Sequence, residues 1–238
     1  MTVADQLCEA SLQLARRLEG LTFSDPVRYV YHPVLYAWRP HEAYIRQYAG
    51  SGRVLLLGMN PGPFGMAQTG VPFGDVHASR DWLNVARPVD VPAMTHPRRP
   101  VLGFDSTRGE GSGRRLWGWA ATMGPPSVFF SRFFVWNYCP LLFLDEGARN
   151  VIPEKLVKAE LRALEDACTW GLQQAVQALN PERVIGVGAY AAARAAHALP
   201  HVQVGQILHP SPANPQANRD WMGTVQRQLE EQGVRLPG

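Results

Sequence analysis

Three side chains of this sequence have the chemistry and the setting to act together in one pocket. They are the amides Asn60 and Asn137 and the imidazole His209, and each is followed within three residues by a proline that stiffens its loop. A stiff loop holds a polar side chain at one angle with little further loss of entropy. Alone, such an Asn is more often a turn former, and such a His is more often a satisfied surface or core residue. Their recurrence in the same setting favours a shared functional site.

Each of the three residues follows an apolar run with the length of a buried strand. The runs cover residues 54–58, 133–136 and 202–208, and residues 183–187 form a fourth. The unbroken apolar run of residues 54–58 is typical of a parallel strand that is buried on both faces. Ligands bind beyond the carboxyl ends of such strands. The sequence therefore predicts that Asn60, Asn137 and His209 meet at one edge of a sheet.

Segments with helical signals alternate with these strands. We expect helices over residues 4–19, 41–48, 75–85, 116–123, 153–179, 189–199 and 219–232, and an irregular segment of functional or mobile character over residues 86–113. This alternation predicts an α/β fold with three layers, α/β/α, around a central, mostly parallel four-stranded sheet. A length of 238 residues suits a single domain over residues 1–238.

Composition narrows the class of protein. The 46% of hydrophobic residues can form a substantial core. We expect no signal peptide, and no apolar run of the given sequence has the length of a membrane span. The widely spaced cysteines match neither a disulfide framework nor a zinc or iron–sulfur site; they are Cys8, Cys139 and Cys168. We expect a monomeric cytoplasmic protein, nucleoid-associated if bacterial, with no metal and no cofactor.

The basic residues are almost all arginines. Of 23 basic residues only two are lysines, Lys155 and Lys158, although a high-arginine genome would give the same excess. Guanidinium groups suit bidentate contacts with phosphate. Five of them gather in one Gly- and Pro-rich segment: Arg98, Arg99, Arg108, Arg114 and Arg115. This clustering favours a polyanionic partner.

Other kinds of active site fit less well. The sequence has neither a Gly-x-x-x-x-Gly-Lys phosphate loop nor a Gly-x-Gly-x-x-Gly dinucleotide motif. Cys139 and His209 could form a nucleophile pair, but Cys139 stands in a Leu- and Phe-rich stretch that is typical of a core. An amide offers one acceptor and two donors, which match the edge of a ring such as uracil. Phe73, either a core residue or a stacking platform, could add about 1–3 kcal/mol by stacking on a base. The inventory therefore indicates a nucleobase site.

Two long motifs carry a specific resemblance. Residues 58–74, GMNPGPFGMAQTGVPFG, and residues 209–218, HPSPANPQAN, resemble the two signature motifs of the single-strand-selective monofunctional uracil-DNA glycosylase family. Residues 137–143, NYCPLLF, are similar to the base-recognition segment of that family. The resemblance covers roughly residues 25–230. It implies a uracil-glycosylase fold, with a four-stranded parallel sheet flanked by helices.

The resemblance also implies roles for the site residues. Asn60 would position the attacking water, and His209 would contact the O2 side of uracil as charge develops. Asn137 would recognise the pyrimidine edge, and Phe73 would stack on the base. The backbone of two further residues would shape the pocket floor: Met59 and Gly62.

A segment that enters the DNA duplex is implied as well. It comprises Pro210, Ser211, Pro212, Ala213, Asn214, Pro215, Gln216 and Arg219. Ala213 stands where family members carry a basic residue, which is a departure within this segment.

The predicted reaction is the excision of uracil, and of C5-oxidised uracils such as 5-hydroxymethyluracil, from single- and double-stranded DNA. Water would attack the N-glycosidic bond of a flipped-out nucleotide and leave an abasic site, as in base excision repair. Gly62 has no side chain, so a C5 substituent would find room. The alternatives are a related glycosylase for hypoxanthine or xanthine, an inactive nucleic-acid-binding module, and an α/β protein acting on free nucleotides.

Overall fold

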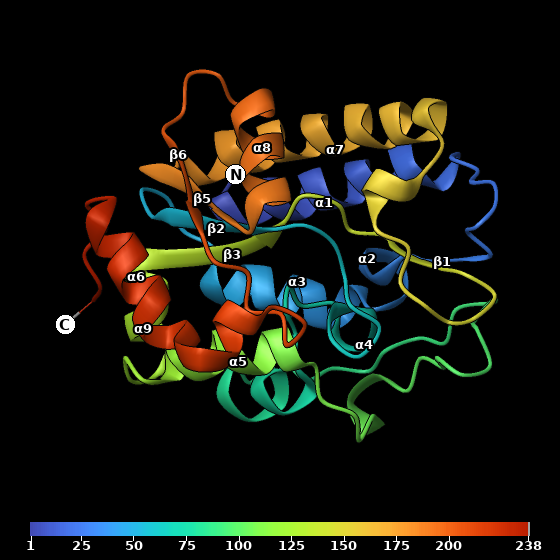
Figure 1. Cartoon of the computed structure of the whole chain (residues 1–238), viewed down its shortest axis with the longest axis horizontal. Helices are drawn as coiled ribbons and strands as arrows, with labels where there is room; N and C mark the ends of the chain where they lie inside the picture. The colour runs from blue at the N-terminus through green and yellow to red at the C-terminus, as the bar shows by residue number, and fades with distance from the viewer. Residues whose placement is uncertain (238) are drawn as a thin grey trace.

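A parallel sheet of four strands forms the centre of the protein, whose computed structural model describes residues 1–237 (Figure 1). The strands run in the order β3 (Phe133–Asn137), β2 (Val54–Gly58), β5 (Arg183–Val187) and β6 (Val204–Ile207). All five residues of β2 are buried, as expected for an apolar run between two neighbouring strands. The register pairs Gly58 with Asn137, so these two strands end at the same edge. The predicted four-stranded parallel sheet is confirmed.

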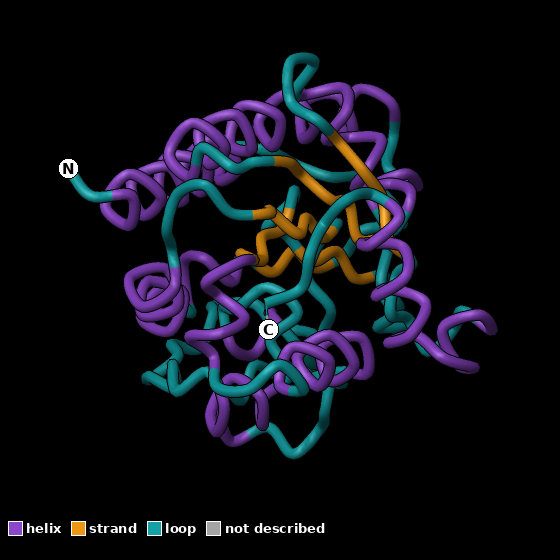
Figure 2. The backbone as a smooth tube through the Cα atoms, turned by 90° about the vertical axis from the view of Figure 1, so that its left-hand side faces the viewer, coloured by secondary structure: helices purple, strands orange, loops and turns teal. Residues whose placement is uncertain are grey.

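Helices cover both faces of this sheet (Figures 1 and 2). One layer contains α1 (Val3–Glu19), α7 (Lys158–Leu179) and α8 (Ala189–Ala198). The other contains α3 (Trp38–Tyr48), α5 (Gly111–Ala121), α6 (Pro126–Arg132) and α9 (Pro215–Glu231). The three-layer α/β/α arrangement is therefore confirmed.

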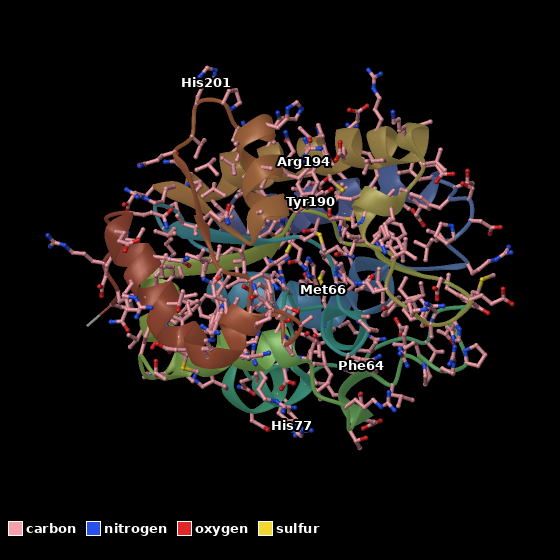
Figure 3. All side chains as sticks on the ribbon, in the orientation of Figure 1. Phe64, Met66, His77, Tyr190, Arg194 and His201 are labelled. Carbon is pink, nitrogen blue, oxygen red and sulfur yellow. The ribbon has the colours of Figure 1, made fainter. Side chains whose placement is uncertain are left out.

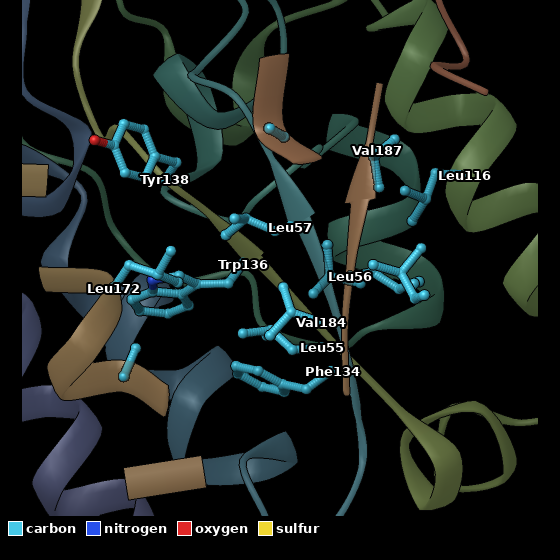
Figure 4. Close-up of a cluster of buried hydrophobic side chains, with 14 of the residues drawn as sticks. Leu55, Leu56, Leu57, Leu116, Phe134, Trp136, Tyr138, Leu172, Val184 and Val187 are labelled. Atoms are coloured by element: carbon cyan, nitrogen blue, oxygen red, sulfur yellow. The ribbon is translucent and has the colours of Figure 1, made fainter. Parts of the chain in front are cut away.

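The core forms where the sheet meets these layers. Figure 4 shows the leucines of β2 between Leu172 of α7 and Leu116 of α5. The ring of Tyr44, in α3, stacks on Phe134 with 5.3 Å between centroids, and its hydroxyl donates to the Val135 carbonyl at 2.8 Å. The aromatic residues of the N-terminal third thus pack on the core, and the buried β2 is held rigidly from both sides.

Two predicted helices begin a full turn or more before the expected residue. The N-terminal turn of α5 starts at Gly111, five residues before Leu116, because the Glu110 carboxylate accepts hydrogen bonds from the N–H groups of Ser112 and Gly113. The last helix, α9, starts at Pro215 and not at residue 219, with the Asn214 side chain capping it. In both cases a side-chain acceptor satisfies the free N–H groups of the first turn.

The segment between β2 and α5 is more regular than predicted. Asp75 accepts a hydrogen bond from Ala78 N at 3.3 Å, as a capping residue does, but the helix closes in a π-helical turn, Ala78–Trp82. Asn84, with φ of 53°, then takes the left-handed conformation and prevents continuation to residue 85. A 3₁₀ turn, Gly103–Asp105, and the start of α5 interrupt residues 86–113, so the prediction of no regular elements there was wrong.

Several short elements were not predicted. Strands β1 (Tyr29–Tyr31) and β4 (Leu142–Leu144) pair in an antiparallel two-stranded sheet, and α2 (Pro33–Tyr36) and α4 (Met66–Thr69) are single turns. Segments of three or four residues are too short for a periodic pattern. A 3₁₀ turn, Pro153–Lys155, precedes α7, which begins later than predicted. No helix of residues 1–237 is both long and apolar enough to span a bilayer.

Candidate active site

A cavity of about 370 Å³ opens at the carboxyl edge of the sheet. It is lined by the loop after β2, by the ends of β3 and β6, and by the start of α5. The six residues predicted for catalysis and base binding all line it: Met59, Asn60, Gly62, Phe73, Asn137 and His209. Residues at the ends of three strands are thus brought together, as the strand-end argument predicted.

Asn60, which lines this cavity, has an unused acceptor. Its Nδ2 donates to the Leu141 carbonyl at 3.3 Å, which fixes the orientation of the amide. Its Oδ1 is buried and has no hydrogen-bond partner among residues 1–237. A buried acceptor without a partner is unfavourable by about 1–3 kcal/mol, so this oxygen is ready to accept a hydrogen bond from a water or ligand.

His209 is held as a neutral ring with a defined tautomer. Ser211 N donates to Nδ1 at 3.1 Å, so Nδ1 is the acceptor and the proton of the neutral imidazole lies on Nε2. Burial lowers the pKa of His209, because the charged form loses its hydration. Gly188, with φ of 94°, allows a close approach: a Cβ there would lie 3.1 Å from the His209 Cβ. The ring therefore offers one N–H donor at the cavity.

Phe73 and Asn137 meet above the last residue of β2. A Cβ on Gly58 would collide with Asn137 Oδ1 and with the Phe73 ring. Asn137 is buried, and within residues 1–237 its Nδ2 donates one hydrogen bond, to the sulfur of Met66 at 3.3 Å. Sulfur is a weak acceptor, so the amide remains available to a better partner. The Phe73 ring lies 6.0 Å from the His209 ring, centroid to centroid.

The backbone of Phe73 is in the left-handed region, with φ of 54°. Such a conformation is unfavourable by about 1–3 kcal/mol for a residue other than glycine. It is maintained by two hydrogen bonds to the Phe73 carbonyl, from Trp117 Nε1 at 3.0 Å and from Asp75 N at 2.7 Å. The surrounding structure therefore holds the half-buried ring of Phe73 at the cavity, although the Phe73 backbone is strained there.

Glu110 is a cavity residue that the sequence analysis did not identify. A Cβ on Gly62 would lie 3.6 Å from Glu110 Cγ, so the carboxylate side chain borders the space beside Gly62. Burial raises the pKa of Glu110, partly offset by its hydrogen bonds to the α5 N–H groups. The available signal was an acid directly before the Gly-Ser-Gly start of a helix.

The segment predicted to enter the duplex has a buried base and an exposed tip. Pro210 is buried and Ser211 lines the cavity, whereas Pro212 and Ala213 are exposed. Asn214 caps α9, and three members of the segment are exposed at the start of that helix: Pro215, Gln216 and Arg219. The exposed tip thus follows the cavity wall directly.

Arg115 of α5 connects this segment to the rest of the site. Its Nη1 donates to the carbonyls of Pro210 at 3.2 Å and Ser211 at 3.3 Å, and its Nη2 donates to Asn218 Oδ1 at 2.6 Å. The predicted arginine cluster is therefore divided. Arg115 fixes the loop after His209, while Arg98, Arg99 and Arg108 line a separate cavity.

Comparison with known proteins agrees with this geometry. Residues 45–230 match the family model described as the uracil DNA glycosylase superfamily. The chain is 47% identical to the single-strand selective monofunctional uracil DNA glycosylase of Mus musculus, over 98% of this chain and 86% of that protein. It is 46% identical to the Bos taurus protein of the same name, over 98% of this chain and 88% of the relative.

A solved structure shares the fold. The crystal structure of wild-type SMUG2 from Pedobacter heparinus superposes with a TM-score of 0.71, over 98% of this chain and 97% of that one, at 19% identity. The family model and the mammalian relatives extend the match to the sequence, including the whole cavity. The chain therefore belongs to the uracil DNA glycosylase superfamily and, within it, to the family of single-strand selective monofunctional uracil-DNA glycosylases.

Proposed function

We propose that this protein is a DNA glycosylase that hydrolyses the N-glycosidic bond of uracil in DNA and leaves an abasic site. The observation that carries this proposal is the pairing, in one cavity, of an unpartnered Asn60 Oδ1 with a neutral His209 whose Nε2 carries a proton. The names of the mammalian relatives, at 46–47% identity, support the same substrate.

In the proposed mechanism the flipped base lies against the Phe73 ring, and the Asn137 amide pairs with the edge of the pyrimidine. Cleavage of the glycosidic bond leaves negative charge on the base and positive charge on the sugar. The His209 Nε2–H group donates to O2, where the negative charge develops. One donor placed in this way contributes on the order of 10²–10³ in rate.

Asn60 has a different role, because an amide cannot take up a proton as a carboxylate can. Its Oδ1 accepts a hydrogen bond from the attacking water and aims the water at the sugar carbon. The reaction thereby forgoes part of the roughly 10²–10⁴ that general base catalysis supplies. It relies instead on departure of the base, which the His209 donor and the stacked ring assist.

The substrate range follows from the wall beside Gly62. With no side chain at this position, the space bordered by Glu110 accommodates a C5 substituent, so we propose activity on 5-hydroxymethyluracil. Activity on double-stranded DNA would use the exposed tip of residues 212–213 beside the cavity. Extrusion of the base from a duplex is unfavourable by a few kcal/mol and is easier from a single strand.

The test is base release from oligonucleotides that each carry one lesion. Uracil, 5-hydroxymethyluracil, hypoxanthine and xanthine are placed in single- and double-stranded DNA, with free deoxyuridine as a further substrate. We expect release of uracil and 5-hydroxymethyluracil, and loss of this release in Asn60→Ala. Release of hypoxanthine or xanthine alone would indicate a different lesion preference. DNA binding without base release would indicate a binding module, and cleavage of free deoxyuridine a small-molecule enzyme.

A further inference from the structure

A second cavity, of about 250 Å³, lies beside the candidate active site. Arg98, Arg99 and Arg108 contribute to its lining together with Phe64. Pro63 lines the first cavity and the next residue, Phe64, lines the second, so the two cavities share one stretch of wall. Met66, two residues after Phe64 and labelled with it in Figure 3, lines the first cavity.

The second cavity carries positive charge that forms no ion pair with a carboxylate of the described residues, 1–237. The guanidinium carbons of Arg99 and Arg108 lie 5.0 Å and 5.2 Å from the centre of the Phe64 ring, within range of a cation–π contact. Within residues 1–237, neither arginine nor Arg98 forms an ion pair with an acidic side chain. In addition, Arg99 Nε is buried without an acceptor. Two oriented guanidinium groups with free donors suit an anion with several oxygens.

The backbone that carries Arg99 is fixed to the catalytic loop. Tyr31 donates from its hydroxyl to the Arg99 carbonyl at 2.6 Å. Gln68 donates from Nε2 both to the Pro63 carbonyl, at 3.0 Å, and to the Pro100 carbonyl, at 3.1 Å. Because of this bridge, the position of the arginine segment is set relative to the loop of Asn60. The second cavity is therefore built into the same framework as the first.

We propose that this second cavity binds a backbone phosphate of the lesion strand, adjacent to the nucleotide whose base occupies the first cavity. A flipped nucleotide remains attached to a phosphate on each side of its sugar, and the wall of Pro63 and Phe64 leads directly to Arg99 and Arg108. The planar guanidinium groups match the two free oxygens of a phosphodiester. This inference rests on the proposed function, because it requires a nucleotide in the first cavity.

The test uses the double variant Arg99→Gln/Arg108→Gln and a single-stranded oligonucleotide with a non-hydrolysable 2′-fluoro-deoxyuridine. We expect the Kd at about 0.1 M salt to rise roughly tenfold. The slope of log K against log salt should become shallower by about 0.7, since one phosphate contact on a single strand contributes about 0.7. Single-turnover release of uracil at saturating DNA should stay within about twofold of the wild type, since neither arginine contacts the reacting atoms in the proposed pose.

Two variants serve as controls. Arg17→Gln removes an arginine that also lies over an aromatic ring, 3.9 Å from the centre of Trp170, but on α1 in the other helical layer. It should leave both the Kd and the slope unchanged. Arg99→Lys/Arg108→Lys keeps the charges and should restore the slope, while recovering only part of the affinity because lysine cannot bind in a bidentate manner.

Oligonucleotides shortened on the 5′ or the 3′ side of the lesion locate the contact. One truncation should weaken the wild type about as much as the double substitution does, and that truncation should weaken the double variant no further. The proposal would be overturned if both truncations weakened DNA binding by the double variant to the same extent. It would also be overturned if Arg17→Gln raised the Kd as much as the double substitution does. The proposal would also be overturned if the double substitution abolished binding of inorganic phosphate but left the affinity for the oligonucleotide unchanged. Failure of the wild type to release uracil would instead refute the proposed function.

Discussion

Asn60 and His209 divide the proposed chemistry between an acceptor for water and a donor for the departing base. The assignment of the donor depends on one hydrogen bond, from Ser211 N to His209 Nδ1. The alternative tautomer would place a hydrogen on Nδ1, facing another N–H group. At the scale of single residues, the backbone of Ser211 therefore decides which atom of His209 reaches the substrate.

His209→Ala should lower the single-turnover rate of uracil release by about 10²–10³, because the donor to the developing oxyanion is lost. The Kd for uracil-containing DNA should change by less than about threefold, because the interaction strengthens mainly in the transition state. His201→Ala is the matched control, since His201 is exposed and Figure 3 shows it far from Phe64 and Met66. A rate for His209→Ala close to that of the wild type would contradict the assigned role.

Gly62→Ala should select between two substrates. The added methyl group would lie 3.6 Å from Glu110 Cγ, an ordinary contact, so the variant should fold normally. It narrows the space proposed for the C5 substituent. We expect release of 5-hydroxymethyluracil to fall at least about tenfold more than release of uracil, the scale of discrimination that one methyl group gives. Gly20→Ala, whose methyl group would meet nothing within 4 Å, controls for the general effect of alanine. Equal losses for the two bases would exclude this wall as the C5 site.

At the scale of elements, the end of β2 sets the spacing of the site. Gly58 lies where the Phe73 ring and the Asn137 amide pass over the strand, and a side chain there would displace both. The end of β2 thus lies under the contact between the loop of Phe73 and the end of β3. Glycine at residue 58 allows Phe73 and Asn137 to pack closely over the strand. Glycine at residue 62 instead leaves space for a substituent of the substrate.

Gly58→Ala should therefore impair release of both bases, by more than about tenfold, because the methyl group separates Phe73 from Asn137. Overpacking should also lower the free energy of unfolding by about 1–3 kcal/mol. Gly118→Ala, in α5, offers a comparison, because its methyl group would meet only Met222 Cε, at 3.7 Å. Single-turnover rates and urea midpoints are the measurements. Full activity of Gly58→Ala would show that the two loops can separate without consequence.

The sequence was informative where one element carries its own signal. The apolar run of residues 54–58 and the Ala-rich residues 189–198 appear in the structure as β2 and α8, close to the predicted bounds. Strands β1 and β4 were not predictable, because each has three residues and is stabilised by pairing with a distant partner. The start of α5 was missed because glycines at residues 111 and 113 disfavour a helix unless Glu110 caps it.

The site also contains residues that the sequence could predict and residues that it could not. Asn60, Asn137 and His209 were predictable, because the ends of parallel strands must meet at one edge. Glu110 was not, because its place beside Gly62 depends on how an irregular segment of about two dozen residues folds back. Sequence patterns predict the position of residues on regular elements, but they do not predict the position of residues that depends on loop packing.

At the scale of the whole molecule, two histidines whose ring nitrogens are buried make the fold sensitive to acid. Burial lowers the pKa of His32 to about 4, and neither of its ring nitrogens has a hydrogen-bond partner among residues 1–237. Burial likewise lowers the pKa of His41 to about 4, with a smaller contribution from nearby His32. Its Nδ1 lies 2.7 Å from the Gly70 carbonyl oxygen. Both rings are therefore neutral in the folded protein at pH 7.

The free energy of unfolding should fall as the pH drops from about 6.5 to about 4. In that window the unfolded chain takes up protons on these histidines and the folded protein does not, so the stability is complete only above pH 6.5. The slope is about 1.4 kcal/mol per pH unit for each histidine. His32→Leu should remove one such contribution, as measured by urea unfolding at pH 7 and pH 5. The exposed His201, changed to Leu, should leave the slope unchanged. An identical slope in His32→Leu would contradict the assignment.

The lone acceptor at Asn60 has a consequence for turnover. A free base that enters the cavity can supply the missing donor and binds only the folded protein, so mass action makes it a stabilising ligand. At a hundred times its Kd, free uracil would raise the free energy of unfolding by about 2.7 kcal/mol. The same affinity makes the released base a competitor of the next lesion. We therefore expect free uracil both to raise the Tm of the protein and to inhibit excision, and both effects would depend on the unsatisfied Oδ1 of Asn60.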